Sequence, residues 1–302
     1  MRIFGHRPQG GGEDPVAAGL ASVAAMEQDG LPLGAKARIE AALTPGAPFT
    51  STLSVSDLLL LERLGIEPVG QVMGSAFYHL GLMGMLMGSG ELTSLTRASY
   101  DARSLAIERM RDEAERLGAH GVVAMHLVRR AHEWSGDLVE FTAMGTAVRL
   151  RQRIPGVDLF MAGMDLPSLA KLMARGQLPV GVAIGLCVYA FLGNWRTTWA
   201  AMSLNNQEMT DLTEMVYRAR GYAMQRMRSD ARELGAAGIA GCRVDLGVTE
   251  IETQNSMGGE QSGWVLEFVA LGDALRPIDS TGGDDGIRPG LDLGDHGKGE
   301  GQ

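Results

Sequence analysis

The sequence predicts an α+β protein built from two tandem β-α-β-β repeats, each with one long helix packed on a small, mostly antiparallel sheet, and preceded by N-terminal helices. Three observations predict this class. Sequence blocks recur in the same order in the two halves of the 302-residue chain. Each half contains a long amphipathic helical pattern, and strand-like segments stand before and after that helix.

The internal duplication is visible in three pairs of blocks. Each pair shares residue types and spacing, and the pairs are Pro68-Val69-Gly70 with Pro179-Val180-Gly181, Tyr100 to Val122 with Tyr217 to Ile239, and Glu140 to Gly145 with Glu267 to Gly272. Chance explains three ordered pairs poorly. We therefore interpret residues 52–152 and 163–277 as two copies of one domain.

The segments outside the two copies differ from them in character. Residues 1–50 are expected to form an N-terminal arm with short helices at about 14–28 and 34–43. Residues 278–302 are rich in Gly and Asp and poor in apolar side chains. Such a segment cannot bury enough apolar surface to offset its ordering entropy, so we predict a disordered tail.

Each copy opens with a short helix. In the first copy Ser54 and Asp57 have the spacing of a capping box, and Gly65 can adopt the left-handed conformation that ends a helix. In the second copy Asp165 can cap the helix and Gly176 ends it. A strand that contains the Pro-Val-Gly block is expected to follow each helix.

The longest uncharged run, residues 178–194, is interpreted as a buried strand and not as a membrane span. A spanning helix needs about 20 apolar residues, and glycines interrupt this run. Its odd positions from Gly181 to Cys187 are small, whereas its even positions from Val182 to Val188 are larger aliphatic residues. This period of two predicts a strand that is covered on both faces.

The rest of each copy is a long helix followed by two strands. The charged residues of the first long helix are expected to form a solvated face: Arg109, Arg111, Asp112, Glu113 and Glu115. The expected helices are 94–117 and 206–234, and the expected strands are 121–131, 138–148, 238–248 and 263–275. Because one helix and three strands leave sheet surface and edges uncovered, we expect the protein to form a homo-oligomer.

Each copy resembles the YbjQ-like family of small bacterial domains, which are described as heavy-metal-binding. The resemblance rests on the blocks PVGQVMG, ARSLAIERMRDEAERLGAHGVV and EFTAMGTAV, and it covers both copies. It implies a fold like that of the dodecin subunit and assembly into rings, typically pentamers. It also implies association with a divalent or heavy metal ion, without supplying a ligand set.

The candidate metal ligands are His120, His126, His132 and Cys242. The histidines are six residues apart, which on one strand separates neighbours by about 20 Å. Because zinc holds its ligands at about 2.0–2.3 Å, a site would need residues from adjacent strands or subunits. The alternative is that the histidines lie on the surface and the cysteines in the core, because Cys242 aligns with Met125 and Cys187 with Ala76.

Other functional classes are disfavoured by motif and composition. The chain has no Gly-x-Ser-x-Gly elbow and no phosphate-binding loop, so we do not expect an enzyme. Its 27 basic and 36 acidic residues give a net charge of −9, which argues against a nucleic-acid partner. Two cysteines suit a reducing compartment, and the first residues lack the apolar core of a secretory signal, so we expect a cytoplasmic protein.

The remaining candidates are shared polar pairs and two tryptophans. Tyr100 with Arg103, and Tyr217 with Arg220, each lie on one helix face; they are interpreted either as contacts between helix and sheet or as the lining of a groove between subunits. Trp195 and Trp199 are candidates for holding a flat aromatic ligand. Two functional hypotheses follow: binding of a metal or small ligand between subunits, or a ring-forming scaffold that recruits protein partners.

Overall fold

The computed structural model describes residues 15–79, 89–131, 138–192, 208–254 and 260–278. The chain divides into two compact units, Met1–Phe49 and Thr50–Gln302. The first unit contains α1 (Pro15–Asp29) and α2 (Leu33–Leu43), which are the two helices predicted for the arm. They contact each other beside the buried Leu31, and an ion pair of 2.8 Å joins Lys36 to Asp29. The predicted disordered tail, apart from Ile278, lies outside the described residues.

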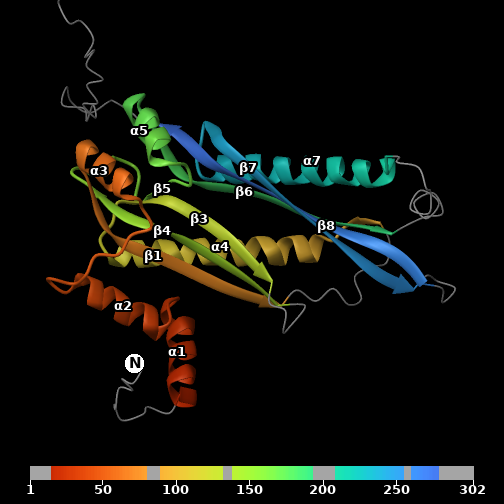
Figure 1. Ribbon diagram of the computed structural model, residues 1–302, viewed down its shortest axis with the longest axis horizontal. Coiled ribbons are helices and arrows are strands. Elements are labelled where there is room, and N and C mark those ends of the chain that lie inside the picture. Colours follow the sequence, from red (N-terminus) through yellow and green to blue (C-terminus); the bar gives the residue numbers. More distant parts are fainter. Residues whose placement is uncertain (1–14, 80–88, 132–137, 193–207, 255–259, 279–302) are drawn as a thin grey trace, which may run out of the picture. The chain divides into compact units, whose positions relative to one another are not determined.

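The second unit contains two four-stranded sheets (Figure 1). Sheet A has the order β1-β4-β3-β5 and sheet B has the order β2-β6-β8-β7. The long strands of each sheet are antiparallel, and their bounds are Ile66–His79 for β1, Gly121–Ala131 for β3, Leu138–Leu150 for β4, Gln177–Leu192 for β6, Gly238–Gln254 for β7 and Glu260–Pro277 for β8. The α+β class and the mostly antiparallel pairing are therefore as predicted.

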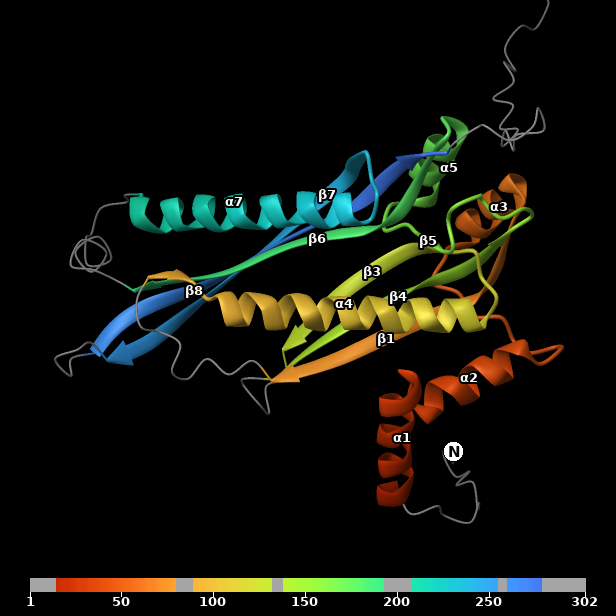
Figure 2. The same cartoon turned by 180° about the vertical axis from the view of Figure 1, so that it is seen from behind.

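The two sheets repeat each other in detail. Helix α4 (Thr93–Arg116) lies along sheet A and α7 (Thr210–Glu233) along sheet B, and each has 24 residues (Figure 2). The first strand of each sheet shifts register after its proline, between Pro68 and Gly70 in β1 and between Pro179 and Gly181 in β6. The third strands shift at equivalent places as well. These shared irregularities confirm that the chain is a tandem duplication.

The short helices form where their capping residues predict them. Helix α3 (Val55–Leu64) begins with a complete capping box between Ser54 and Asp57 and ends at Gly65, whose φ is 68°. Helix α5 (Leu166–Ala174) begins at Asp165, whose carboxylate accepts a hydrogen bond of 2.7 Å from the Ser168 N–H. The Ser168 N–H also holds the pKa of Asp165 below its ordinary value. Each helix thus has its first turn fixed by a side chain.

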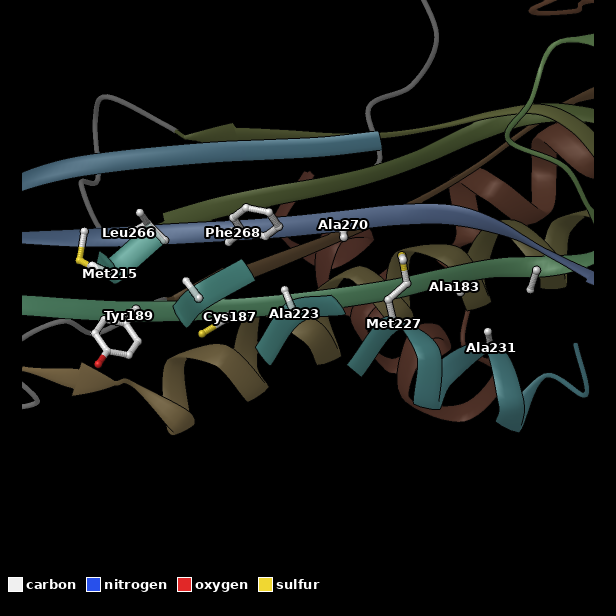
Figure 3. Packing of buried hydrophobic residues seen from close by; sticks show 12 residues of the cluster. Ala183, Cys187, Tyr189, Met215, Ala223, Met227, Ala231, Leu266, Phe268 and Ala270 are labelled. Atoms are coloured by element: carbon white, nitrogen blue, oxygen red, sulfur yellow. The ribbon is translucent and has the colours of Figure 1, made fainter. Parts of the chain in front are cut away.

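Strand β6 is covered on both faces, as its period of two predicts. Its small residues lie against α7, where Ala183 and Cys187 pack with Ala223 and Met227 (Figure 3). A Cβ on Gly185 would lie 2.0 Å from the Ala223 carbonyl oxygen, so only glycine permits this approach of helix and strand. No helix in the described parts of the chain combines the length and apolar character that a membrane crossing requires.

Two short strands were not predicted, and both connect the repeats. Strand β2 (Gly90–Glu91) precedes α4 in the first repeat but pairs with β6 of the second repeat. Strand β5 (Phe160–Met161) precedes the second repeat but pairs in parallel with β3 of the first repeat. The first repeat therefore adds a short strand to the sheet of the second, and the segment that leads into the second repeat adds one to the sheet of the first.

Candidate functional site

The boundary between the two repeats brings together the polar residues that recur in the sequence. Tyr100 on α4 donates a hydrogen bond of 2.5 Å to Asp230 Oδ1 on α7. The second oxygen of the same carboxylate accepts a bond of 2.7 Å from the Ile184 N–H on β6. One carboxylate of the second repeat thus holds both its own first strand and the long helix of the first repeat.

Arg103 lies one helical turn from Tyr100 and is buried, with 3% of its surface exposed. Its guanidinium forms an ion pair of 2.9 Å with Glu267 on β8 and lies 4.4 Å from the centre of the Phe141 ring. Arg129 on β3 approaches the same Glu267 at 3.2 Å. Glu267 is therefore held by two arginines of the first repeat.

Tyr100 and Arg103 both remain hydrogen-bond donors at neutral pH. Burial, and then the bond to Asp230, raise the pKa of the Tyr100 hydroxyl, so this group stays a donor at neutral pH. Burial lowers the pKa of Arg103, and Glu267 opposes that shift. The guanidinium remains charged, because arginine is protonated over the whole physiological range. A buried, paired charge of this kind is costly to separate from its partner.

The short strand β2 adds a second polar contact between the repeats. Glu91 in this strand forms an ion pair of 2.6 Å with Arg226 on α7, and Arg226 also donates to the Leu186 carbonyl at 2.9 Å. Thr96 at the start of α4 accepts a bond of 2.9 Å from the Val188 N–H. Burial, and then the charge of Glu91, raise the pKa of the Cys187 thiol to about 12, so this thiol is inert at neutral pH.

The segment around β5 makes the third contact. The Ala162 N–H donates to the Val122 carbonyl and the Met125 N–H to the Ala162 carbonyl, each at 2.9 Å. The next residue, Gly163, donates a bond of 2.5 Å to the buried carboxylate of Asp273 on β8. Burial raises the pKa of Asp273, and the Gly163 N–H opposes that shift. This segment therefore binds sheet A on one side and sheet B on the other.

The structure treats the two predicted polar pairs differently. Tyr100 and Arg103 lie at the boundary between the repeats, as described above. Tyr217, which is 65% exposed, and Arg220 lie on the exposed side of α7. The candidates Trp195, Trp199 and His132 lie outside the described residues.

The predicted metal ligands that the structure describes, His120, His126 and Cys242, form no metal-binding group within the chain. His120 accepts a bond of 3.1 Å at Nδ1 from the Leu150 N–H, and burial followed by the charge of Arg153 lowers its pKa. His126 is exposed on β3. Cys187 is buried but Cys242 is exposed on β7, so the prediction of two core cysteines is wrong for Cys242. Over the described residues, no three His, Cys, Asp or Glu side chains form a group that could hold a metal ion.

Several residues of the boundary were not predicted from the sequence, and others were assigned wrongly. Asp230, Glu267 and Glu91 were not singled out, although Glu267 recurs as Glu140 in the duplicated block. The solvated face predicted for the first long helix is wrong in part: Glu113 is 2% exposed and accepts a bond of 2.7 Å from the Met73 N–H, and Arg109 donates to the Ser75 carbonyl. Helical spacing alone does not show which charged residues face the sheet.

The fold and this boundary define a class: tandem α+β repeats that are joined by short strands and by ion pairs. A family model described as "Putative heavy-metal-binding" matches residues 67–151 and 193–274, one match in each repeat. The chain belongs to this YbjQ-like family.

Some relatives match most of the chain, and others match about one repeat. The chain is 34% identical over 248 residues to a protein named "Encapsulin nanocompartment protein" from Mycobacterium tuberculosis. The aligned residues make up 80% of this chain and 89% of that relative. Proteins named UPF0145 from Clostridium perfringens and Thermosipho africanus are 38% and 35% identical over 105 and 108 residues. These matches cover 35% and 34% of this chain and 91% and 95% of the two relatives, so a protein of this family can consist of little more than one repeat.

Proposed function

We propose that this chain is a non-enzymatic scaffold protein that assembles with further copies of itself into a closed oligomer. The observation that carries the proposal is the outer strand of sheet B. Strand β7 is at the edge of the sheet, and it exposes Val244, Leu246 and Val248 along one face. An open edge with apolar side chains is a template for pairing with another chain, and monomeric proteins normally protect such an edge.

The comparison with the mycobacterial relative supports a structural role. That relative carries the name "Encapsulin nanocompartment protein", and the similarity extends over most of both chains. By this similarity we propose that the assembly formed here is a structural part of a protein nanocompartment. A ring that recruits protein partners is the simplest form of such a part.

Light scattering coupled to size exclusion, followed by negative-stain electron microscopy, tests this function on the purified full-length chain. We expect an oligomer at micromolar concentration and closed particles of uniform diameter. A monomer throughout that concentration range would contradict the proposal. Open, irregular aggregates would contradict the closed oligomer and, with it, the proposed structural role.

A second candidate function is binding of a divalent or heavy metal ion at positions between copies, which the family description favours. The exposed His126 and Cys242 are the described candidates that a neighbouring copy can reach. Elemental analysis of tag-free protein after dialysis tests this candidate, with Cys242→Ser and His126→Ala as the variants. Metal well below one ion per chain in the assembled protein would refute it.

A further inference from the structure

We propose that the contact between the two repeats within one chain is repeated between chains. In that contact the second repeat of one copy docks on the first repeat of a second copy, with Arg220 paired to Glu140 and Glu208 paired to Arg109. The inference rests on the proposed self-assembly and names the surfaces that it uses. Its argument comes from the duplication, because each repeat carries both halves of the contact.

Two surfaces define the contact. The front surface is the side of a repeat that supplies the long-helix tyrosine and arginine, and the back surface is the side that receives them. In the contact within the chain, the front residues are Glu91, Thr96, Tyr100 and Arg103, and the back residues are Arg226, Asp230 and Glu267. The front surface of the second repeat and the back surface of the first repeat take no part in this contact.

The other two surfaces carry the same residue types. By the alignment of the duplicated blocks, Glu91, Thr96, Tyr100 and Arg103 correspond to Glu208, Thr213, Tyr217 and Arg220. The back residues Arg226, Asp230 and Glu267 correspond to Arg109, Glu113 and Glu140. The back surfaces also share their local geometry, since Arg109 and Arg226 each donate to a carbonyl of the first strand, and Glu113 and Asp230 each accept an N–H from it. Three polar pairs of the internal contact, Glu91–Arg226, Tyr100–Asp230 and Arg103–Glu267, thus have counterparts of the same charge on the other two surfaces.

Exposure distinguishes the front surface of the first repeat from that of the second. Arg103 is buried and paired, whereas its counterpart Arg220 is exposed and makes no ion pair with any residue that the structure describes. Tyr100 is half-buried, whereas Tyr217 is exposed. On the back surface, Nε of Arg109 is buried without a hydrogen-bond partner among the described residues. A second copy would bring Glu208 to this arginine, as Glu91 is brought to Arg226.

The edge strands show the same relation. Met125 in β3 is 2% exposed, and its N–H is bonded to Ala162 beside β5. Its counterpart in β7 is Cys242, which is exposed. The residues that correspond to Phe160–Met161 are Phe49 and Thr50. In the repeated contact these residues of the second copy add a short strand to β7 and cover Cys242.

One position departs from the pattern. Arg129, which shares Glu267 with Arg103, corresponds to the exposed Leu246. The contact between chains therefore has one ion pair fewer and one apolar side chain more than the contact within the chain. Because the front and back surfaces differ, the contact is head-to-tail, and each copy has one surface left for the next. A second copy is the occupant that fits. The back surface of its first repeat carries the same residue types as the back surface that already binds a front surface within the chain.

Charge reversal at the proposed pair tests the inference in the full-length chain. We expect Arg220→Glu and Glu140→Arg each to weaken assembly about 30-fold or more in size exclusion with light scattering, because each places like charges in a desolvated contact. The double variant Arg220→Glu/Glu140→Arg should recover most of the assembly. Arg218→Glu is the matched control, since its counterpart Asp101 stays exposed in the internal contact.

Labelling of Cys242 with a maleimide gives an independent measure of the same contact. We expect this thiol to be protected in the assembled wild-type protein and reactive in Arg220→Glu, while Cys187 is protected in both. An oligomer that survives both single reversals with Cys242 reactive would overturn this inference and leave the proposed self-assembly intact. A wild-type monomer would instead overturn the proposed function, and the inference with it. Circular dichroism checks that each variant is folded.

Discussion

Tyr100 and Tyr217 show how two equivalent residues acquire different roles in one chain. They occupy equivalent positions on the two long helices, yet Tyr100 donates a hydrogen bond to Asp230 whereas Tyr217 is exposed. The sequence cannot distinguish them, because the difference arises from which repeat has a neighbour within the chain. The energetic role of each tyrosine therefore depends on the contact that surrounds it.

Substitution of Tyr100 by Phe removes the hydroxyl that joins α4 to Asp230. We expect the free energy of unfolding to fall by about 1.5–3 kcal/mol, which is the usual range for a hydrogen bond to a charged group. Urea denaturation at neutral pH measures this change, and it is made in an Arg220→Glu chain so that unfolding is not coupled to dissociation. Tyr217→Phe in the same chain is the control and should change stability by less than about 0.5 kcal/mol. Equal losses in the two variants would contradict the assignment.

The same hydroxyl predicts a pH dependence. Burial and the bond to Asp230 raise the pKa of Tyr100 above its ordinary value of 10.0 in the folded chain. Because the folded pKa lies above the unfolded one, the stabilisation is complete below pH 10 and is lost as pH rises above it. The stability difference between the chain with Tyr100 and its Tyr100→Phe variant should therefore be constant from pH 7 to pH 9 and shrink above pH 10. A difference that grows with pH would be incompatible with this sign.

At the scale of elements, the packing of each long helix on its first strand depends on one glycine. A Cβ on Gly185 would lie 2.0 Å from the Ala223 carbonyl oxygen, and a Cβ on Gly74 would lie 2.1 Å from the Ala106 carbonyl oxygen. These glycines occupy equivalent positions in the two repeats. The alternation of small residues in β6 thus has a physical cause, which is the close approach of α7.

Substitution of Gly185 by Ala should force α7 away from β6. We expect a loss of about 1–3 kcal/mol in the free energy of unfolding, as for other overpacked cores. Gly70→Ala is the matched control in the first strand of the other repeat, because nothing lies within 4 Å of a Cβ at that position. Thermal and urea denaturation of the two variants, each in the Arg220→Glu chain, make the comparison. Similar stability of the two variants would show that the helix can shift without cost.

The elements that could be predicted are those whose signals are local. The capping box at Ser54 and the period of two in β6 involve neighbours in sequence, and both are present as predicted. Strands β2 and β5 could not be predicted, because each has two residues and owes its conformation to a strand of the other repeat. The exposure of Cys242 could not be predicted for a related reason. Cys242 aligns with Met125, but the segment beside β5 that binds Met125 is not visible in the alignment.

At the scale of the whole molecule, the duplication makes the chain a covalently joined pair of repeats with one contact formed between them, and in the proposed assembly the equivalent contact forms between chains. A heterologous contact of this kind closes into a ring or continues as a filament. Closure requires that the rotation per chain divides a full turn with no shift along the axis. A ring of these chains contains an even number of repeats, since each chain supplies two.

Mixing two variants that cannot assemble alone tests this arrangement. Arg220→Glu alters the front surface and Glu140→Arg alters the back surface, so each variant is expected to repel its own copies. In a mixture, the acidic front surface of the first variant meets the basic back surface of the second, and the remaining front and back surfaces are of the wild-type kind. Assembly should therefore return only in the mixture, with the two variants alternating in a one-to-one ratio.

Native mass spectrometry of the mixture, with one variant labelled with ¹⁵N, measures both the ratio and the number of chains. An alternating ring must contain an even number of chains. The resemblance to the YbjQ-like family implies a pentamer. If the wild-type ring has five chains, or any other odd number of chains, the mixture must form a ring of a different size or an open chain. Random incorporation of the two variants, or assembly of either one alone, would show that copies meet through other surfaces.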